Sequence, residues 1–301
     1  MKQLRELLEK AKNSGPKTVA VAVAEDDVVL NAIESARKEG IINGILVGTR
    51  SKIIQLAEKN GIDLGKYEIL DEPVESKAAD AAVRLVAEGK ADFLMKGKIK
   101  TGDLMRVVLK EEYGLRTGKT LSLVSIFEIP NYHKLLVVSD AGMTIAPELK
   151  QKVDIINNAV LVSRKAIGID LPKVAVLGAV EIVNPKMPAT IEAAILTKMN
   201  QRGQIKGCVV DGPFALDNAV SIEAARHKGI ESPVAGDADV LIMPDIEAGN
   251  IFYKAMVFLS GAKVASTIIG AKVPVALTSR ADSDEAKLLS LALTNLMVGG
   301  S

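Results

Sequence analysis

Residues 239–254, DVLIMPDIEAGNIFYK, join an apolar strand to a helix. The junction carries Pro244, Asp245, Gly249 and Asn250, and the packing of a strand against a helix does not require so many small and polar residues. In a parallel α/β sheet the carboxyl ends of the strands face the ligand crevice, and the first turn of the following helix offers free backbone N–H groups to an anion. The stretch therefore predicts a binding site.

The rest of the chain repeats this alternation of strand and helix. Apolar runs such as TVAVAVA (18–24) and GILVGT (44–49) alternate with helical patterns that end at glycine. Such alternation predicts a mostly parallel, doubly wound sheet. Residues 121–143 differ, because only the short turn PNYHK separates two strand patterns there, which predicts an antiparallel hairpin.

The length of 301 residues favours two α/β lobes with a cleft between them. The hairpin is a suitable place for the chain to leave the first lobe, and the final strand and helix return to it. We therefore expect a first lobe of residues 1–122 plus 271–301 and a second lobe of residues 123–270.

A second junction, VPVALTSRADSDEA (273–286), places Ser279 and Arg280 directly after a strand. The planar guanidinium of arginine matches the geometry of phosphate, and a serine hydroxyl can donate to an oxyanion. This pair predicts a site that handles phosphate.

A third junction, MKGKIKTGDLMR (95–106), follows the strand pattern ADFLMKG. Lys98, Thr101 and Gly102 are expected to line the N-terminus of the next helix, with Arg106 one turn further on. The loop is neither a P-loop nor a GxGxxG fingerprint, so it predicts an anion site without specifying the ligand.

Composition excludes several classes of function. A formal net charge of +1 and 3% aromatic residues argue against a nucleic-acid surface. The amphipathic N-terminus and the lack of a long apolar stretch predict a cytoplasmic protein without a membrane partner. One cysteine and two histidines leave no material for a disulfide or a Cys/His metal site.

Three acidic residues, Asp140, Asp211 and Asp245, each follow a predicted strand. Their spacing permits a divalent metal site, although acids on three separate loops occur readily in any α/β protein. We predict no bound metal, and assign Asp140 and Asp211 to substrate binding and Asp245 to catalysis.

The junctions in order closely resemble those of the phosphate acetyl/butyryltransferase family. The matching motifs are LMKGKIKTGDLMR, VVSDAGM, NPKMP, DGPFALDNAVS, PDIEAGNIFYK and TSRADSDE, and they span nearly the whole chain. The DAGM loop (140–143) and the NPKMP loop (184–188) look more like those of the butyryltransferases than of the acetyltransferases.

The resemblance implies a fold like that of isocitrate and isopropylmalate dehydrogenases, without NAD. It implies reversible acyl transfer from butyryl-CoA to inorganic phosphate, with coenzyme A as a substrate, no permanently bound cofactor, and a homodimer or larger homo-oligomer. The catalytic roles carry over to Ser279, Arg280 and Arg106. Gly249, Asn250 and Lys254 of the PDxxAGNxxYK motif are assigned to substrate binding.

One family feature is missing, because the position of the aspartate base is occupied by Ala286. Asp282, Asp284 and Asp245 remain as substitutes for it. Other functions also remain open at this point: a phosphate acetyltransferase, an NAD-dependent decarboxylating dehydrogenase of the same broad fold, and a non-enzymatic sensor of acyl-CoA or acyl phosphate.

Overall fold

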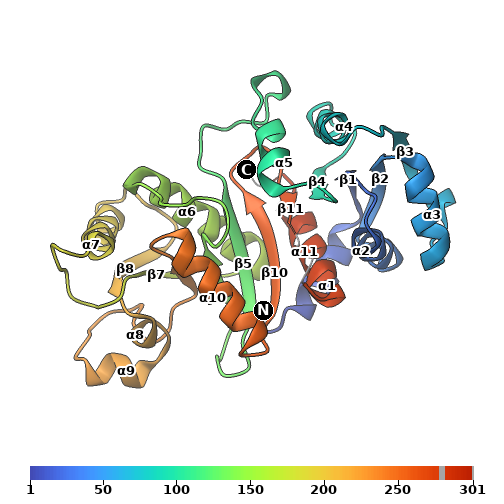
Figure 1. The fold of residues 1–301 in the computed structure, drawn as a ribbon. Helices are drawn as coiled ribbons and strands as arrows, with labels where there is room; N and C mark the ends of the chain where they lie inside the picture. Colours follow the sequence, from blue (N-terminus) through green and yellow to red (C-terminus); the bar gives the residue numbers. More distant parts are fainter. Residues whose placement is uncertain (278–281, 300–301) are drawn as a thin grey trace. The chain divides into compact units, whose positions relative to one another are not determined.

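The structure is a computed structural model that describes residues 1–277 and 282–299, and the chain divides into two compact units (Figure 1). Unit 1 contains Met1–Leu4 and Lys119–Val264, and unit 2 contains Arg5–Gly118 and Ala265–Ser301. The chain thus changes unit after Gly118 and after Val264, whereas the sequence placed the corresponding changes after residues 122 and 270.

Unit 2 has an α/β fold, in which helices pack against a β-sheet. Its strands lie in the order β3-β2-β1-β4-β11-β10, with parallel pairs from β3 to β11 and an antiparallel pair between β11 and β10. Its elements are α1 (Arg5–Ser14), β1 (Lys17–Ala22), α2 (Asp27–Lys38), β2 (Ile42–Gly48), α3 (Arg50–Asn60), the 3-10 helix η1 (Leu64–Lys66), β3 (Glu68–Asp71), α4 (Glu75–Ala87), β4 (Phe93–Lys96), α5 (Thr101–Val108), the 3-10 helix η2 (Glu111–Tyr113), β10 (Lys263–Ile269), β11 (Val275–Ala276) and α11 (Asp284–Met297).

Helix α11 is the centre of the packing in unit 2. It is buried along nearly its whole length and contacts both α1 and α2. Its Asn295 side chain donates hydrogen bonds to the backbone oxygens of Ile41 (2.8 Å) and Gly15 (3.2 Å), and it accepts one from Ser14 Oγ (3.0 Å). The C-terminal segment is thereby held to the loops that precede β1 and β2.

The strands of unit 1 lie in the order β5-β6-β9-β7-β8 and are of mixed direction. Strands β5 and β6 are antiparallel, which confirms the predicted hairpin, and the pairs from β6 to β8 are parallel. Its elements are β5 (Ser122–Glu128), β6 (Leu136–Ser139), α6 (Leu149–Val162), the π-helix η3 (Ser163–Ile167), β7 (Lys173–Leu177), α7 (Pro188–Gln201), β8 (Val209–Phe214), α8 (Leu216–Val220), α9 (Ile222–His227), β9 (Val240–Ile242) and α10 (Ile246–Phe258).

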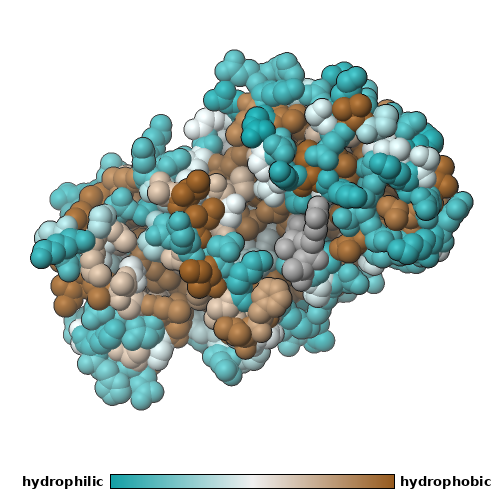
Figure 2. Space-filling view, viewed as in Figure 1, coloured by the Kyte–Doolittle hydropathy of each residue, from teal (hydrophilic) through white to brown (hydrophobic). Residues whose placement is uncertain are grey.

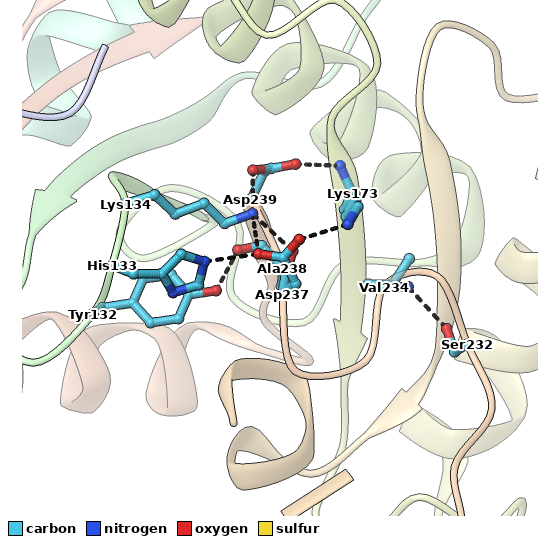
Figure 3. Close-up of polar contacts among 9 residues, drawn as sticks. All are labelled: Tyr132, His133, Lys134, Lys173, Ser232, Val234, Asp237, Ala238 and Asp239. Carbon is cyan, nitrogen blue, oxygen red and sulfur yellow. Dashed lines mark hydrogen bonds and ion pairs between the residues drawn. The ribbon is translucent and has the colours of Figure 1, made fainter. Parts of the chain in front are cut away.

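Charged side chains join the hairpin turn to the amino ends of β7 and β9 (Figure 3). Asp237 accepts from His133 Nε2 (2.8 Å), from Lys134 Nζ (2.8 Å) and from Lys173 Nζ (2.5 Å). Lys134 also reaches Asp239, at 2.7 Å. This network fixes the amino-terminal end of the unit 1 sheet, so that the loops with the candidate site residues extend from the opposite, carboxyl-terminal end.

The predicted α/β class with a mostly parallel sheet is confirmed. Within the part of the chain that the structure describes, no helix is both long enough and apolar enough to cross a membrane.

Candidate active site

Two of the predicted junctions meet at the carboxyl ends of β6 and β9. Ser139 pairs with Ile242 in the parallel ladder, and the N–H of Met243 donates to the oxygen of Ser139 at 2.8 Å. Beyond the strands, the N–H of Ile246 donates to the oxygen of Ile145 at 2.9 Å. The loop that begins at Asp140 and the junction that carries Asp245 therefore lie side by side, although about a hundred residues separate them in the sequence.

Asp140 organises the first of these loops. Its side chain is 3% exposed, and its carboxylate accepts four backbone hydrogen bonds, from Leu123 (3.1 Å), Gly142 (3.0 Å), Met143 (3.1 Å) and Thr144 (2.8 Å). Burial raises the pKa of the Asp140 carboxyl, and the backbone donors oppose this rise. Because these bonds already occupy both oxygens, the geometry favours a loop-forming role over the predicted contact with substrate.

Gly249 and Asn250 hold the same loop from the side of α10. A Cβ atom on Gly249 would lie 2.3 Å from the backbone oxygen of Asp140 and 3.0 Å from Cα of Ala141. Asn250 Nδ2 donates to the oxygen of Ala141 at 3.3 Å. The AGN part of the motif thus brings α10 into close contact with the loop that begins at Asp140. This contact is a structural reason for a glycine at 249 and an asparagine at 250.

Asp245 is the N-cap of α10. Its Oδ1 accepts a hydrogen bond from the N–H of Ala248 at 2.8 Å, and the side chain is half-buried. Aspartate at this position satisfies one of the free N–H groups of the first turn. The second carboxylate oxygen forms no hydrogen bond or ion pair with a described residue, so it remains available for chemistry.

The structure separates Lys254 from Asp245. Lys254 lies eight residues after the first residue of α10, Ile246, which corresponds to about 12 Å along the helix axis. Its Nζ lies 5.5 Å from the ring centroid of Tyr253 and 5.8 Å from that of Phe258. These contacts with aromatic rings point Lys254 along the helix and away from its N-terminus.

Asp211 also lies apart from the other two acids. It belongs to β8, which is two strands away from β9 in the sheet, or about 10 Å. Its Oδ1 accepts from the N–H of Gly212 at 2.8 Å. Over residues 1–277 and 282–299, no group of three acidic, histidine or cysteine side chains is placed to hold a metal ion, so the three acids do not form the permitted metal site.

In unit 2, the loop after β4 is tied to the end of β1. The N–H groups of Gly97 and Lys98 donate to the oxygens of Ala22 (2.9 Å) and Val23 (2.8 Å). A Cβ atom on Gly97 would lie 2.1 Å from the Val23 oxygen, so only glycine permits this approach. Lys96 Nζ donates to the backbone oxygens of Gly97 and Ile99, both at 3.1 Å, and fixes the loop from the inside.

The helix that follows, α5, begins with open backbone donors. Lys100 is its N-cap, and no side chain of a described residue caps the helix there. Thr101 is half-buried and Gly102 is exposed at the first turn. The Arg106 side chain is 78% exposed and pairs with Asp103 at 2.7 Å. This end of the helix can receive an anion, and Arg106 is free to change partner because its present ion pair is on the surface.

A cavity of about 700 Å³ opens at the carboxyl ends of the unit 2 strands, and the predicted residue Lys98 lines it. Sequence reasoning missed six other charged residues of its lining, which are Glu25, Asp26, Asp27, Lys52, Glu72 and Glu75. Several of them have structural partners, and Asp27, for example, accepts from Lys59 Nζ at 2.8 Å. Asp26 caps α2 by accepting from the N–H groups of Val28 and Val29, and Glu25 accepts from the N–H of Thr49 at 2.9 Å. The sequence did contain a signal for this charged lining, because the acidic run EDD (25–27) directly follows the strand pattern TVAVAVA (18–24).

Ser279 and Arg280 lie outside the described residues. The segment that follows them starts α11, whose N-cap Ser283 accepts from the N–H of Ala286 at 3.1 Å. Ala286, at the position of the family's aspartate, is buried. Of the possible substitutes for that aspartate, Asp284 is 84% exposed and lies 3.5 Å from Lys287.

Helix N-termini at the carboxyl ends of a mostly parallel sheet are typical of enzymes that bind anionic substrates. Comparison with known proteins defines the family: the model described as "Phosphate acetyl/butaryl transferase" matches residues 3–81 and 68–295. The chain therefore belongs to the phosphate acetyl/butyryltransferase family, which confirms the resemblance inferred from its motifs.

Individual relatives carry both names of the family. The chain is 57% identical to a phosphate acetyltransferase of Thermotoga maritima, over 97% of this chain and 98% of that protein. It is 51% identical to a phosphate butyryltransferase of Clostridium acetobutylicum, over 99% of each. A solved structure of a branched-chain phosphotransacylase from Enterococcus faecalis V583 is also similar, with a TM-score of 0.82, 36% identity, and coverage of 95% of this chain and 100% of that one.

Proposed function

We propose that this protein transfers a short acyl group reversibly between coenzyme A and inorganic phosphate, with butyryl-CoA as the preferred donor. Butyryl-CoA and phosphate then give butyryl phosphate and free coenzyme A. The observation that carries the proposal is the family match, which extends from residue 3 to residue 295. Acetyl-CoA is the alternative donor, since relatives of both names have similar identities to this chain.

Phosphate attacks the thioester carbonyl directly in this mechanism. Arg280 and Arg106 hold the phosphate, because a guanidinium fork matches its oxygens and each charged hydrogen bond contributes about 1.5–3 kcal/mol. Ser279 donates to the oxyanion that develops on the carbonyl, or to the departing thiolate. The open first turn of α5, at Thr101 and Gly102, adds backbone donors for an anionic group of either substrate.

A carboxylate is needed in the reverse direction. The thiol of coenzyme A has a pKa near 8.5, so a base that accepts its proton assists attack on butyryl phosphate. We assign this role to Asp245, because its N-cap bond uses only Oδ1. Asp284 suits this role less well, because it is 84% exposed at the first residue of α11.

Coenzyme A serves as a substrate in this proposal, and no metal or permanently bound cofactor takes part. Lys98 at the edge of the 700 Å³ cavity is assigned to substrate binding. We further propose that the protein works in the cytoplasm as a homodimer or larger homo-oligomer. The similarity of this fold to that of isocitrate and isopropylmalate dehydrogenases remains a prediction.

The test is thiol release from acetyl-, propionyl- and butyryl-CoA, with and without phosphate. Release should require phosphate and be fastest with butyryl-CoA, and prior treatment with a chelator should leave the rate unchanged. Release without phosphate would identify a thioesterase. Binding of butyryl-CoA without turnover would identify a sensor, and a rate lost on chelation and restored by magnesium or manganese would overturn the metal-free mechanism.

A further inference from the structure

Ile145 is a large apolar side chain that lies exposed beside the candidate active site. Figure 2 shows hydrophobic residues at the surface of unit 1 with hydrophilic ones between them, and the Ile145 side chain is 69% exposed. Among the described residues 140–148 and 243–245, which form the two loops that meet after β6 and β9, Ile145 is the only exposed large apolar residue. A single exposed isoleucine is common at protein surfaces, so its position decides whether it has a function.

The loop holds Ile145 in a defined place. The backbone N–H groups of residues 142–144, directly before it, donate to the buried carboxylate of Asp140. The oxygen of Ile145 itself accepts from the N–H of Ile246 at 2.9 Å. Ile145 is therefore held both through the preceding residues and through its own carbonyl group, so the exposure of its side chain does not come from a loosely held backbone.

The first turn of α10 fixes the position of Ile145 relative to Asp245. The Ile145 oxygen accepts from the N–H of Ile246, the first residue of the helix, and Asp245 Oδ1 accepts from the N–H of Ala248 at 2.8 Å. Both residues thus satisfy free backbone donors of the same turn, one through its carbonyl group and the other through its side chain. An apolar residue is in this way placed next to the proposed base.

We infer that Ile145 contacts the acyl chain of the substrate and favours butyryl-CoA over acetyl-CoA. The inference rests on the proposed function, in which Asp245 accepts the proton of the thiol. The sulfur of the thioester then lies beside Asp245, and the acyl chain begins at the carbon bonded to that sulfur. Butyryl exceeds acetyl by two methylene groups, and each one that leaves water for apolar contact favours binding about 4-fold.

The first test compares kcat/KM for the two donors. Ile145→Ala should lower kcat/KM for butyryl-CoA about 10-fold and change that for acetyl-CoA less than about twofold. Ile145→Val should keep the preference, whereas Ile145→Thr, which resembles valine in shape but carries a hydroxyl, should lose it. The control is Leu171→Ala, because Leu171 is 57% exposed but precedes β7, at the opposite end of the unit 1 sheet, and this variant should keep both values.

The second test measures binding without turnover. Titration calorimetry in the absence of phosphate should show that the wild type binds butyryl-CoA about 10-fold more tightly than acetyl-CoA, and that Ile145→Ala loses most of this difference. Equal Kd values in the wild type, or an unchanged preference in Ile145→Ala, would place the acyl chain elsewhere. An equal loss for both donors would show that Ile145 only supports the loop, and each of these results would overturn the inference. If neither donor reacted with phosphate, the proposed function would fail, while the Kd values would still decide the role of Ile145.

Discussion

The backbone oxygen of Asp140 occupies the space beside Gly249 that any larger residue would need. A Cβ atom on Gly249 would lie 2.3 Å from this oxygen, and the buried Asp140 carboxylate holds the rest of the loop through four backbone N–H groups. The DAGM loop and the PDxxAGN junction therefore pack tightly together and depend on each other for their conformation. Substitutions in it should affect stability and the site together.

Gly249→Ala should displace the 140–143 loop, because a methyl group cannot share the space of a carbonyl oxygen. We expect a loss of about 1–3 kcal/mol in the free energy of unfolding, as for other overpacked sites, measured by urea denaturation. Gly102→Ala is the control for stability, since no described atom lies within 4 Å of a Cβ atom there. Equal stability of Gly249→Ala and the wild type would contradict the close contact.

Asp245 has a structural role as a cap and a proposed role as a base, and two substitutions separate them. Asparagine is as good an N-cap as aspartate, so Asp245→Asn should unfold like the wild type yet lose about 100-fold in kcat. Asp245→Ala should also lose about 1 kcal/mol of stability, because the cap bond to Ala248 disappears. If Asp245→Asn kept full activity, the residue would be a cap alone.

Arg106 should contribute to phosphate binding in spite of its ion pair with Asp103. Arg106→Ala should raise KM for phosphate about 10- to 100-fold, the scale of one charged contact, in steady-state assays. Arg84→Ala is the control, because Arg84 also forms a surface ion pair, with Asp80 on the neighbouring helix α4, and has no proposed role. Unchanged kinetics in Arg106→Ala would remove this residue from the site.

Glu34 links the stability of unit 2 to pH. Arg37 binds its carboxylate through two hydrogen bonds (2.8 and 3.0 Å), and Tyr67 donates a third (2.5 Å). The hydrogen bonds from Arg37 are the largest cause of the shift, and they lower the pKa of Glu34 to about 2 against the opposing effect of burial. An unfolded glutamate has a pKa of about 4.3, so this stabilisation is complete above that pH and disappears as the pH falls towards 2.

Glu34→Gln should therefore cost about 1–3 kcal/mol at pH 7, and the difference from the wild type should shrink below pH 4. Urea denaturation at pH 7 and pH 3 measures both values. Tyr67→Phe is the partner control, since it removes one hydrogen bond but leaves the ion pair with Arg37 intact. A difference that stayed constant between the two pH values would show that the charge of Glu34 is not the cause.

The sequence predicted those features that depend on neighbouring residues. Alternating strands and helices, the hairpin around PNYHK and the helix start at Asp245 follow from local patterns of hydrophobicity and capping. The convergence of the Asp140 and Asp245 loops was also predictable, because parallel strands place their carboxyl ends at one edge of a sheet.

Features that depend on distant contacts were not predictable in this way. The sequence does not indicate that Leu123, in another strand, donates to Asp140, or that Lys254 turns towards two aromatic rings. The charged lining of the unit 2 cavity comes from segments after four different strands, so no single motif contains it. Those side chains acquire their roles only when the sheet is assembled.

The proposed hydrogen bond from Ser279 gives the most direct test of the mechanism. If its hydroxyl donates to the reacting carbonyl or thiolate, Ser279→Ala should lower kcat about 10²- to 10³-fold with little change in KM, as the loss of one oriented donor does. Ser260→Ala, after the exposed end of α10, is the control and should retain full activity.

Direct attack by phosphate also requires that no acyl-enzyme accumulates. Wild-type protein quenched rapidly after mixing with butyryl-CoA in the absence of phosphate should therefore keep its unmodified mass, and a stoichiometric butyryl adduct on Ser279 would instead establish covalent catalysis.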